Sequence, residues 1–130
     1  MIAVVRRTPN VEVDSLFAMI VARWRHAIRI GAVISESHGL ADRACNAGFL
    51  RNLTSNERYS MFQEHESSSK VCHLDPGGVL SATAAVQRDI AYGCDFAILS
   101  KFGKLETEGS GLVDAFTAAV EAGVPVLTSV

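Results

Sequence analysis

The chain has 130 residues, of which 48% are hydrophobic and 20% are charged, and its formal net charge is −2. This length suits one domain, over residues 1–130, and it buries enough apolar surface to fold without disulfides or a structural metal. The near-neutral charge excludes a broad basic face for nucleic acid, and no apolar run approaches the roughly 20 residues that span a bilayer. We therefore expect neither nucleic acid nor a membrane as partner.

The N-terminus and the cysteines indicate a cytoplasmic protein. The opening apolar run, residues 1–5, precedes its charges and is followed by no small-residue cleavage site, so it does not resemble a secretory signal. Cys45, Cys72 and Cys94 are odd in number and have no CxxC spacing. This pattern argues against a disulfide scaffold and against a closed zinc site.

The first third of the chain predicts a βαβ unit. Residues 2–5 form a continuous apolar run rich in β-branched side chains, which predicts a buried strand. Asp14 and Ser15 offer a helix cap, and apolar residues then recur at helical spacing until Gly31 ends the helix. The apolar residues 32–34 begin a second strand. Such a unit normally has parallel strands joined by a right-handed crossover.

The middle of the chain predicts a loop followed by a hairpin. Residues 35–47 show little periodicity and indicate an irregular loop. Residues 49–53 and 58–62 alternate loosely on either side of the polar cluster 54–57, which favours a β-hairpin. The serine-rich residues 65–70 predict an exposed loop.

Two helix–strand pairs complete the predicted fold. A helix capped by Asp75, with a proline in its first turn, runs to Gly93. A strand over residues 95–100 follows, then a helix over 112–123 and a strand over 124–130. This order predicts a single three-layer α/β domain with a mainly parallel sheet, flanking helices and an antiparallel hairpin at one edge.

Charged residues follow the strand predicted over residues 95–100. Two lysines and two glutamates fall within eight positions, namely Lys101, Lys104, Glu106 and Glu108. In an open α/β sheet, ligands bind outside the carboxyl ends of the strands, in loops of this kind. We therefore place the candidate site in this loop.

Four cations are expected to converge at this edge of the sheet. Arg6 and Arg7 follow the first strand, and Lys101 and Lys104 follow a later one. Together they would suit an oxyanion such as phosphate, sulfate or molybdate, or a nucleotide. The alternative is that all four are surface charges that pair with nearby glutamates.

The other polar residues allow weaker interpretations. Glu106 and Glu108 either hold a metal or orient the start of a helix, or, as we prefer, they are solvated and favour the N-terminus of the last helix. Cys72 and His73 have suitable ligand atoms for a transition metal, but no ligand spacing supports them. Cys94 begins a buried strand, which is typical of core packing.

Four segments resemble the signature of the bacterial domain of unknown function 2478 family. They are DFAILSKFGKLETEGSGL (residues 95–112), AGVPVLT (122–128), CHLDP (72–76) and the opening run 2–5, so that the resemblance covers nearly the whole chain. That family is similar to P-loop nucleoside triphosphatases, and its members are often associated with molybdate-transport genes. The resemblance implies a P-loop-like fold, a nucleotide or an oxyanion as ligand, and a connection to molybdate handling.

Compared with active P-loop enzymes, both halves of the nucleotide machinery are altered. A Walker A loop has the pattern GxxxxGK[ST], whereas residues 6–15 contain no glycine and no lysine. In the active relatives the strand corresponding to residues 95–100 ends in an acidic pair that holds Mg²⁺, and here Ser100 and Lys101 take those positions. The positions that stay similar are Gly103, Lys104 and Glu106. Because phosphoryl transfer needs both halves, we expect no efficient NTP hydrolysis.

The sequence therefore predicts a protein that binds an anion or nucleotide, with molybdate as a ligand suggested by the family association alone. The candidate binding residues are Arg6, Arg7, Thr8, Ser100, Lys101, Gly103, Lys104 and Glu106, and no catalytic residue is assigned. Two alternatives stay open: an active nucleoside triphosphatase or kinase-like enzyme with a non-standard phosphate loop, and a regulatory module that binds a protein partner. A homo-oligomer is a further open alternative.

Overall fold

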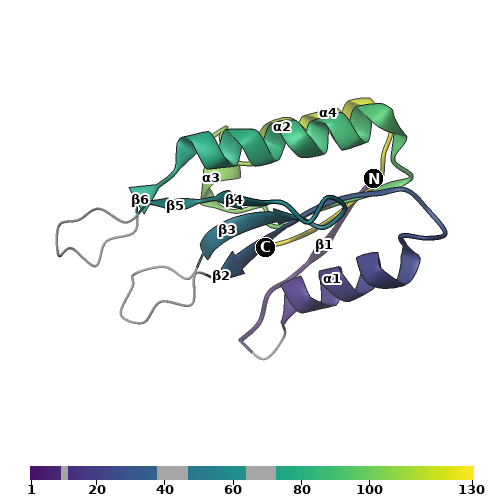
Figure 1. Ribbon diagram of the computed structural model, residues 1–130, viewed down its shortest axis with the longest axis horizontal. Coiled ribbons are helices and arrows are strands. Elements are labelled where there is room, and N and C mark those ends of the chain that lie inside the picture. Colours follow the sequence, from purple (N-terminus) through teal and green to yellow (C-terminus); the bar gives the residue numbers. More distant parts are fainter. Residues whose placement is uncertain (10–11, 38–46, 64–72) are drawn as a thin grey trace.

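The computed structural model describes residues 1–9, 12–37, 47–63 and 73–130 (Figure 1). The helices in this part of the chain are α1 (Val13–Trp24), α2 (Pro76–Gly93), α3 (Lys104–Thr107) and α4 (Val113–Glu121). The strands are β1 (Ile2–Val5), β2 (Ile30–Ser37), β3 (Ala47–Asn52), β4 (Arg58–Ser60), β5 (Phe62–Gln63), β6 (His73–Leu74), β7 (Phe96–Leu99) and β8 (Val126–Ser129). Within the described residues, no helix is long and apolar enough to cross a membrane.

Six of the strands form one sheet in the order β1-β8-β7-β2-β3-β4. The first four strands in that order run parallel to one another. Strand β3 is antiparallel to β2, and β4 is antiparallel to β3. The predicted hairpin is therefore present at one edge of a mainly parallel sheet. Strands β5 and β6 form a separate two-stranded antiparallel pair, which the sequence did not predict.

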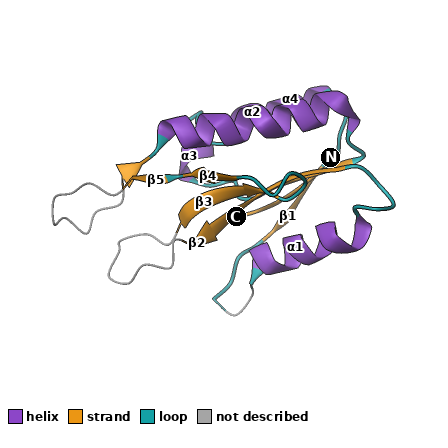
Figure 2. Ribbon diagram, viewed as in Figure 1, coloured by secondary structure: helices purple, strands orange, loops and turns teal. Residues whose placement is uncertain are grey.

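The helices cover both faces of the sheet and produce three layers (Figure 2). In Figure 1, α1 lies below the sheet, and α2 and α4 lie above it. Strand β7 contributes to both apolar clusters, because its side chains alternate: Ile98 packs with the α1 side, and Ala97 and Leu99 pack with the α2 and α4 side. Burial on both faces explains why β7 is a continuous apolar run. This is the predicted α/β class, and it is consistent with a P-loop-NTPase-like fold.

The predicted start of α2 is confirmed. The Asp75 side chain accepts a hydrogen bond from the Gly78 backbone amide at 3.2 Å, and Pro76 occupies the first turn. Asp75 thus satisfies one of the amides that a helix leaves unpaired at its N-terminus, where proline has no amide to lose.

The predicted limits of α1 are wrong at both ends. The helix begins at Val13, with Glu12 at the N-cap and no side-chain capping bond, so Asp14 is not the cap. It ends at Trp24 rather than near Gly31, and in the tight turn that follows the amides of residues 27 and 28 both donate to the Trp24 carbonyl oxygen. That turn brings the chain back to the sheet, where β2 starts.

The prediction of a buried first strand is also wrong. Strand β1 pairs with β8 alone, and the side chains of Ile2 and Val4 are 46% and 54% exposed. It is parallel to β2, as a βαβ unit requires, but β8 and β7 lie between them. An apolar run predicts that a segment forms a strand, but it does not predict whether that strand lies at the centre or at the edge of the sheet.

Two predicted loops lie largely outside the described residues. Strand β2 continues through Ser37 and β3 begins at Ala47, so the interpretation of residues 35–47 as a loop is wrong at both margins. Residues 65–70 lie wholly outside the described part of the chain.

Candidate anion-binding site

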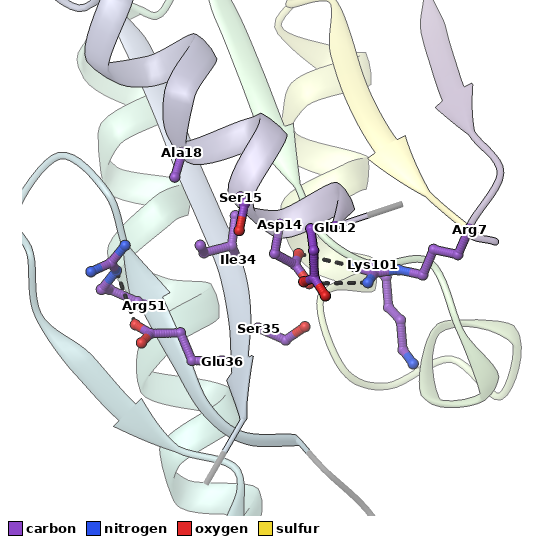
Figure 3. A pocket seen from close by; sticks show the side chains of 10 residues that line it. All are labelled: Arg7, Glu12, Asp14, Ser15, Ala18, Ile34, Ser35, Glu36, Arg51 and Lys101. Carbon is purple, nitrogen blue, oxygen red and sulfur yellow. Dashed lines mark hydrogen bonds and ion pairs between the residues drawn. The ribbon is translucent and has the colours of Figure 1, made fainter. Parts of the chain in front are cut away.

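The carboxyl ends of the parallel strands and the N-terminus of α1 meet at one edge of the sheet. They enclose a cavity of about 680 Å³, called here the polar cavity (Figure 3). Its lining residues are Arg7, Glu12, Asp14, Ser15, Ala18, Ile34, Ser35, Glu36, Arg51 and Lys101. The cavity therefore lies where ligands bind in open α/β sheets.

The arginine that follows β1 is held by a carboxylate from α1. Arg7 Nη1 and Nη2 donate to the two oxygens of Asp14 at 3.0 and 2.9 Å, and Arg7 Nε donates to Ser129 Oγ at 2.8 Å. Asp14 stands in the first turn of α1, where the helix dipole favours a negative charge. The bidentate pair fixes Arg7 across the ends of β1 and β8.

Ser100 completes this network from the end of β7. Its hydroxyl donates to Asp14 Oδ1 at 2.7 Å and accepts from Arg7 Nη2 at 2.8 Å. Ser100 and Ser129 are both fully buried. Buried hydroxyls of this kind need partners, and here each has one in Arg7. The Asp14 carboxylate consequently occupies the Arg7 guanidinium that would otherwise be available to an external anion.

Among the described residues, the lining of the polar cavity is balanced in charge. Its cationic residues are Arg7, Arg51 and Lys101, and its acidic residues are Glu12, Asp14 and Glu36. Arg51 pairs with Glu36 at 2.9 Å, just as Arg7 pairs with Asp14. A cavity lined by cations alone, as the sequence suggested, is not what these residues form.

Lys101 differs from the other cavity cations. It is exposed, and no carboxylate among the described residues pairs with it. Figure 3 shows its side chain extending away from the Arg7–Asp14 pair. Of the described cations that line the polar cavity, Lys101 is therefore the one whose charged group is available to a ligand.

A second cavity, of about 190 Å³, lies beside the first and is called here the apolar cavity. Its lining residues are Ser35, Leu50, Met61, Val79, Ser100, Lys101, Gly103, Lys104, Leu105, Glu106, Gly111 and Leu112. Ser35 and Lys101 line both cavities, so the two spaces meet at these residues.

Glu106 braces the loop between β7 and α4. Its Oε2 accepts from the Gly103 amide at 2.8 Å, and its Oε1 accepts from the Leu112 amide at 2.9 Å. The second bond orients the start of α4, which is one of the roles considered from the sequence, but the preferred prediction that Glu106 is solvated is wrong, because its side chain is buried. Gly111 leaves room for this carboxylate, since a Cβ there would lie 2.2 Å from Glu106 Oε1.

The structure brings together most of the sequence-predicted binding residues. Arg7 and Lys101 line the polar cavity, and Ser100, Lys101, Gly103, Lys104 and Glu106 line the apolar cavity. Arg6 and Thr8 are exposed and line neither cavity. The four predicted cations thus do not converge on one space: Lys101 shares one cavity with Arg7 and the other with Lys104.

The sequence does not reveal that Asp14 and Glu36 line the polar cavity. It predicts Asp14 to be a helix cap and Glu36 to lie in a loop. Asp14 follows Glu12, the N-cap residue of α1, by two positions, and this second carboxylate is the available signal, because capping needs only one such residue. No sequence pattern predicts the ion pair between Glu36 and Arg51.

The metal-ligand candidates are not assessed by the structure. Cys72 lies outside the described residues, and of His73 only the backbone, in β6, is described. Among the described residues, no group of three or more histidine, cysteine, aspartate or glutamate side chains could hold a metal ion.

Cys94 lies away from the site, after α2, and its thiol is partly buried. Its Sγ donates to the Asp89 carbonyl oxygen at 3.1 Å. Burial, followed by the charge of Asp89, raises the pKa of the Cys94 thiol above its usual value. The thiol is therefore neutral near pH 7 and behaves as a packing group, as predicted.

A sequence profile of the family described as "Protein of unknown function (DUF2478)" matches residues 2–130. The chain belongs to this family. It is also similar to the "Molybdenum import ATP-binding protein ModC 2" of Bradyrhizobium diazoefficiens, with 32% identity over 132 residues, covering 99% of this chain and 14% of that relative. The chain thus spans about a seventh of that relative's length. No solved structure matches it.

The family membership confirms the resemblance found in the sequence. It assigns no reaction, because the DUF2478 family is itself described as one of unknown function. The function of this family member must therefore be inferred from the residues around Lys101.

Proposed function

We propose that this protein binds an oxyanion or a nucleotide at the carboxyl ends of β7 and β2, without efficient NTP hydrolysis. The observation behind the proposal is Lys101, an exposed cation that borders two cavities and has no carboxylate partner among the described residues. A lysine ammonium binds oxyanions as a point charge with three donors.

The neighbouring residues support Lys101 in different ways. Lys104 lines the apolar cavity, and its 4.0 Å contact with Glu108 is an exposed pair that contributes little stability. It is therefore available as a second cation. Arg7 and Ser100 are held by Asp14, so we assign them to shaping the wall of the site.

The nature of the ligand is suggested by the similar protein. Its name includes both molybdenum import and ATP binding, so molybdate and ATP are the first candidate ligands to test at this anion site. The absence of hydrolysis is inferred from Ser100 and Lys101, which stand where active P-loop relatives have an acidic pair. A cytoplasmic location and a homo-oligomeric state stay predictions.

Calorimetric titration of phosphate, molybdate and ATP into the purified protein tests the proposal. We expect saturable binding of at least one of them, and a loss of about 10- to 100-fold in affinity for Lys101→Ala, which is the effect of removing a charge-assisted hydrogen bond. Arg6→Ala is the matched control, because Arg6 is an exposed cation that lines neither cavity, and its affinity should be unchanged. If none of the three anions binds to the unaltered protein, the proposal is wrong.

The same samples distinguish binding from catalysis. We expect no phosphate release from ATP and Mg²⁺ above the background rate. Turnover that disappears in Lys101→Ala would instead favour an active nucleoside triphosphatase with a non-standard phosphate loop.

A further inference from the structure

The apolar cavity has a different chemical character from the polar cavity. Five large apolar side chains line it, namely Leu50, Met61, Val79, Leu105 and Leu112. In the polar cavity, the apolar lining residues within the described part of the chain are Ala18 and Ile34. A phosphate or molybdate ion would gain nothing from those five side chains, because burial of apolar surface against them stabilises only apolar groups.

Three of the five side chains are held rigidly by the protein core. Leu50, Val79 and Leu112 are at most 5% exposed and belong to the apolar cluster that packs α2 and α4 on the sheet. Since packed cores keep their shape, this part of the wall is formed before a ligand arrives.

The two cavities meet at a single cation. Lys101 and Ser35 line both of them, and Lys101 has no partner carboxylate among the described residues. A ligand bound to the Lys101 ammonium therefore lies beside an apolar space. Ligand pockets commonly combine an apolar lining with a few well-placed polar groups that fix orientation.

We propose that the ligand has two parts, an anionic group at Lys101 and a compact apolar group in the apolar cavity. The inference rests on the proposed anion site and specifies the class of its ligand: a small organic anion, such as a phosphate ester or a carboxylate with one ring or one branched chain. The volume of about 190 Å³ is below the range of about 300–1,000 Å³ typical of whole ligand pockets, so this cavity takes part of the ligand only.

The first test compares two probes on the unaltered protein. Inorganic phosphate and phenyl phosphate carry the same anionic group, and calorimetry measures the affinity of each. We expect phenyl phosphate to bind about 10-fold more tightly or better, as burial of a ring predicts. Equal affinities would overturn the two-part ligand and leave the anion site in place. Binding of neither probe would instead refute the anion site at Lys101.

The second test places the ring in the apolar cavity. Met61→Ala removes part of the cavity wall, and Met19→Ala is the control, because Met19 is an exposed α1 residue that lines neither cavity. We expect Met61→Ala to reduce the preference for phenyl phosphate by about 3- to 10-fold, with the affinity for inorganic phosphate unchanged. The unchanged phosphate affinity also shows that the variant is folded. A full preference for phenyl phosphate in Met61→Ala would overturn the assignment.

Discussion

Both oxygens of Glu106 accept hydrogen bonds from backbone amides that lie nine residues apart in the sequence, those of Gly103 and Leu112. The side chain is buried, so no water can replace these bonds if the carboxylate is lost. This one residue thus determines the path of the loop that carries Lys101 and Lys104 to the edge of the sheet.

Removing the Glu106 carboxylate should destabilise the fold. We expect Glu106→Ala to lower the free energy of unfolding by about 2–4 kcal/mol, because two amides lose a charged acceptor. Glu108→Ala is the control, since Glu108 is exposed and makes one long contact with Lys104; it should change stability by less than about 0.5 kcal/mol. Urea denaturation measures both values. A similar effect of the two substitutions would show that Glu106 does not brace the loop.

Asp14 determines whether Arg7 is available to bind an anion. Arg7 follows the first strand and is a reasonable anion ligand on sequence grounds, but its guanidinium faces the Asp14 carboxylate. Such a contact between residues in a loop and a helix depends on where α1 starts. Helix boundaries are the least precise part of a sequence-based prediction. Here α1 begins at Val13, so Asp14 lies inside the helix, where it pairs with Arg7, rather than at the cap.

At the scale of elements, α2 approaches β4 closely enough that one glycine is required. A Cβ at Gly78 would lie 1.7 Å from the Ser60 carbonyl oxygen, which belongs to the backbone and cannot turn aside. The neighbouring Gly77 has ordinary space, since its nearest such contact is 3.5 Å from Asp75 Oδ1. The first turn of α2 therefore positions one wall of the apolar cavity.

This close approach leads to a paired prediction. Gly78→Ala should lower the free energy of unfolding by at least about 2 kcal/mol, because the helix must shift away from β4. Gly77→Ala should leave stability unchanged or raise it slightly, as alanine favours helix. Thermal or urea denaturation of the two variants measures the difference. Equal stabilities would mean that α2 and β4 are farther apart than described.

Two of the helices were predictable in position and extent, and the shortest elements were not. Helices α2 and α4 follow from apolar spacing and from Asp75 and Gly123, since caps and glycines are local signals. The four-residue helix α3 has no periodicity to detect, and β5 and β6 have only two residues each. Their formation depends on the packing around them, which no local pattern encodes.

At the scale of the whole molecule, strand order is the feature that the sequence did not contain. The apolar run of β1 is as strong as that of β7, yet β1 lies at the edge and β7 at the centre of the sheet. The order β1-β8-β7-β2 also brings together Arg7, Asp14, Glu36 and Lys101 from four separate segments. The position of the polar cavity was therefore predictable from the charged loop after β7, but the balance of charge among its described lining residues was not.

Anion binding at Lys101, where the two cavities meet, is the central proposal. An NMR titration with inorganic phosphate, following backbone amides in ¹H–¹⁵N spectra, tests this directly. We expect saturable shifts at Ser35, Lys101 and Gly103, with little change at Ile2 or at Arg6. Shifts confined to other parts of the chain, such as the cavity beside Arg25 and Arg29, or no shifts at all, would contradict the account.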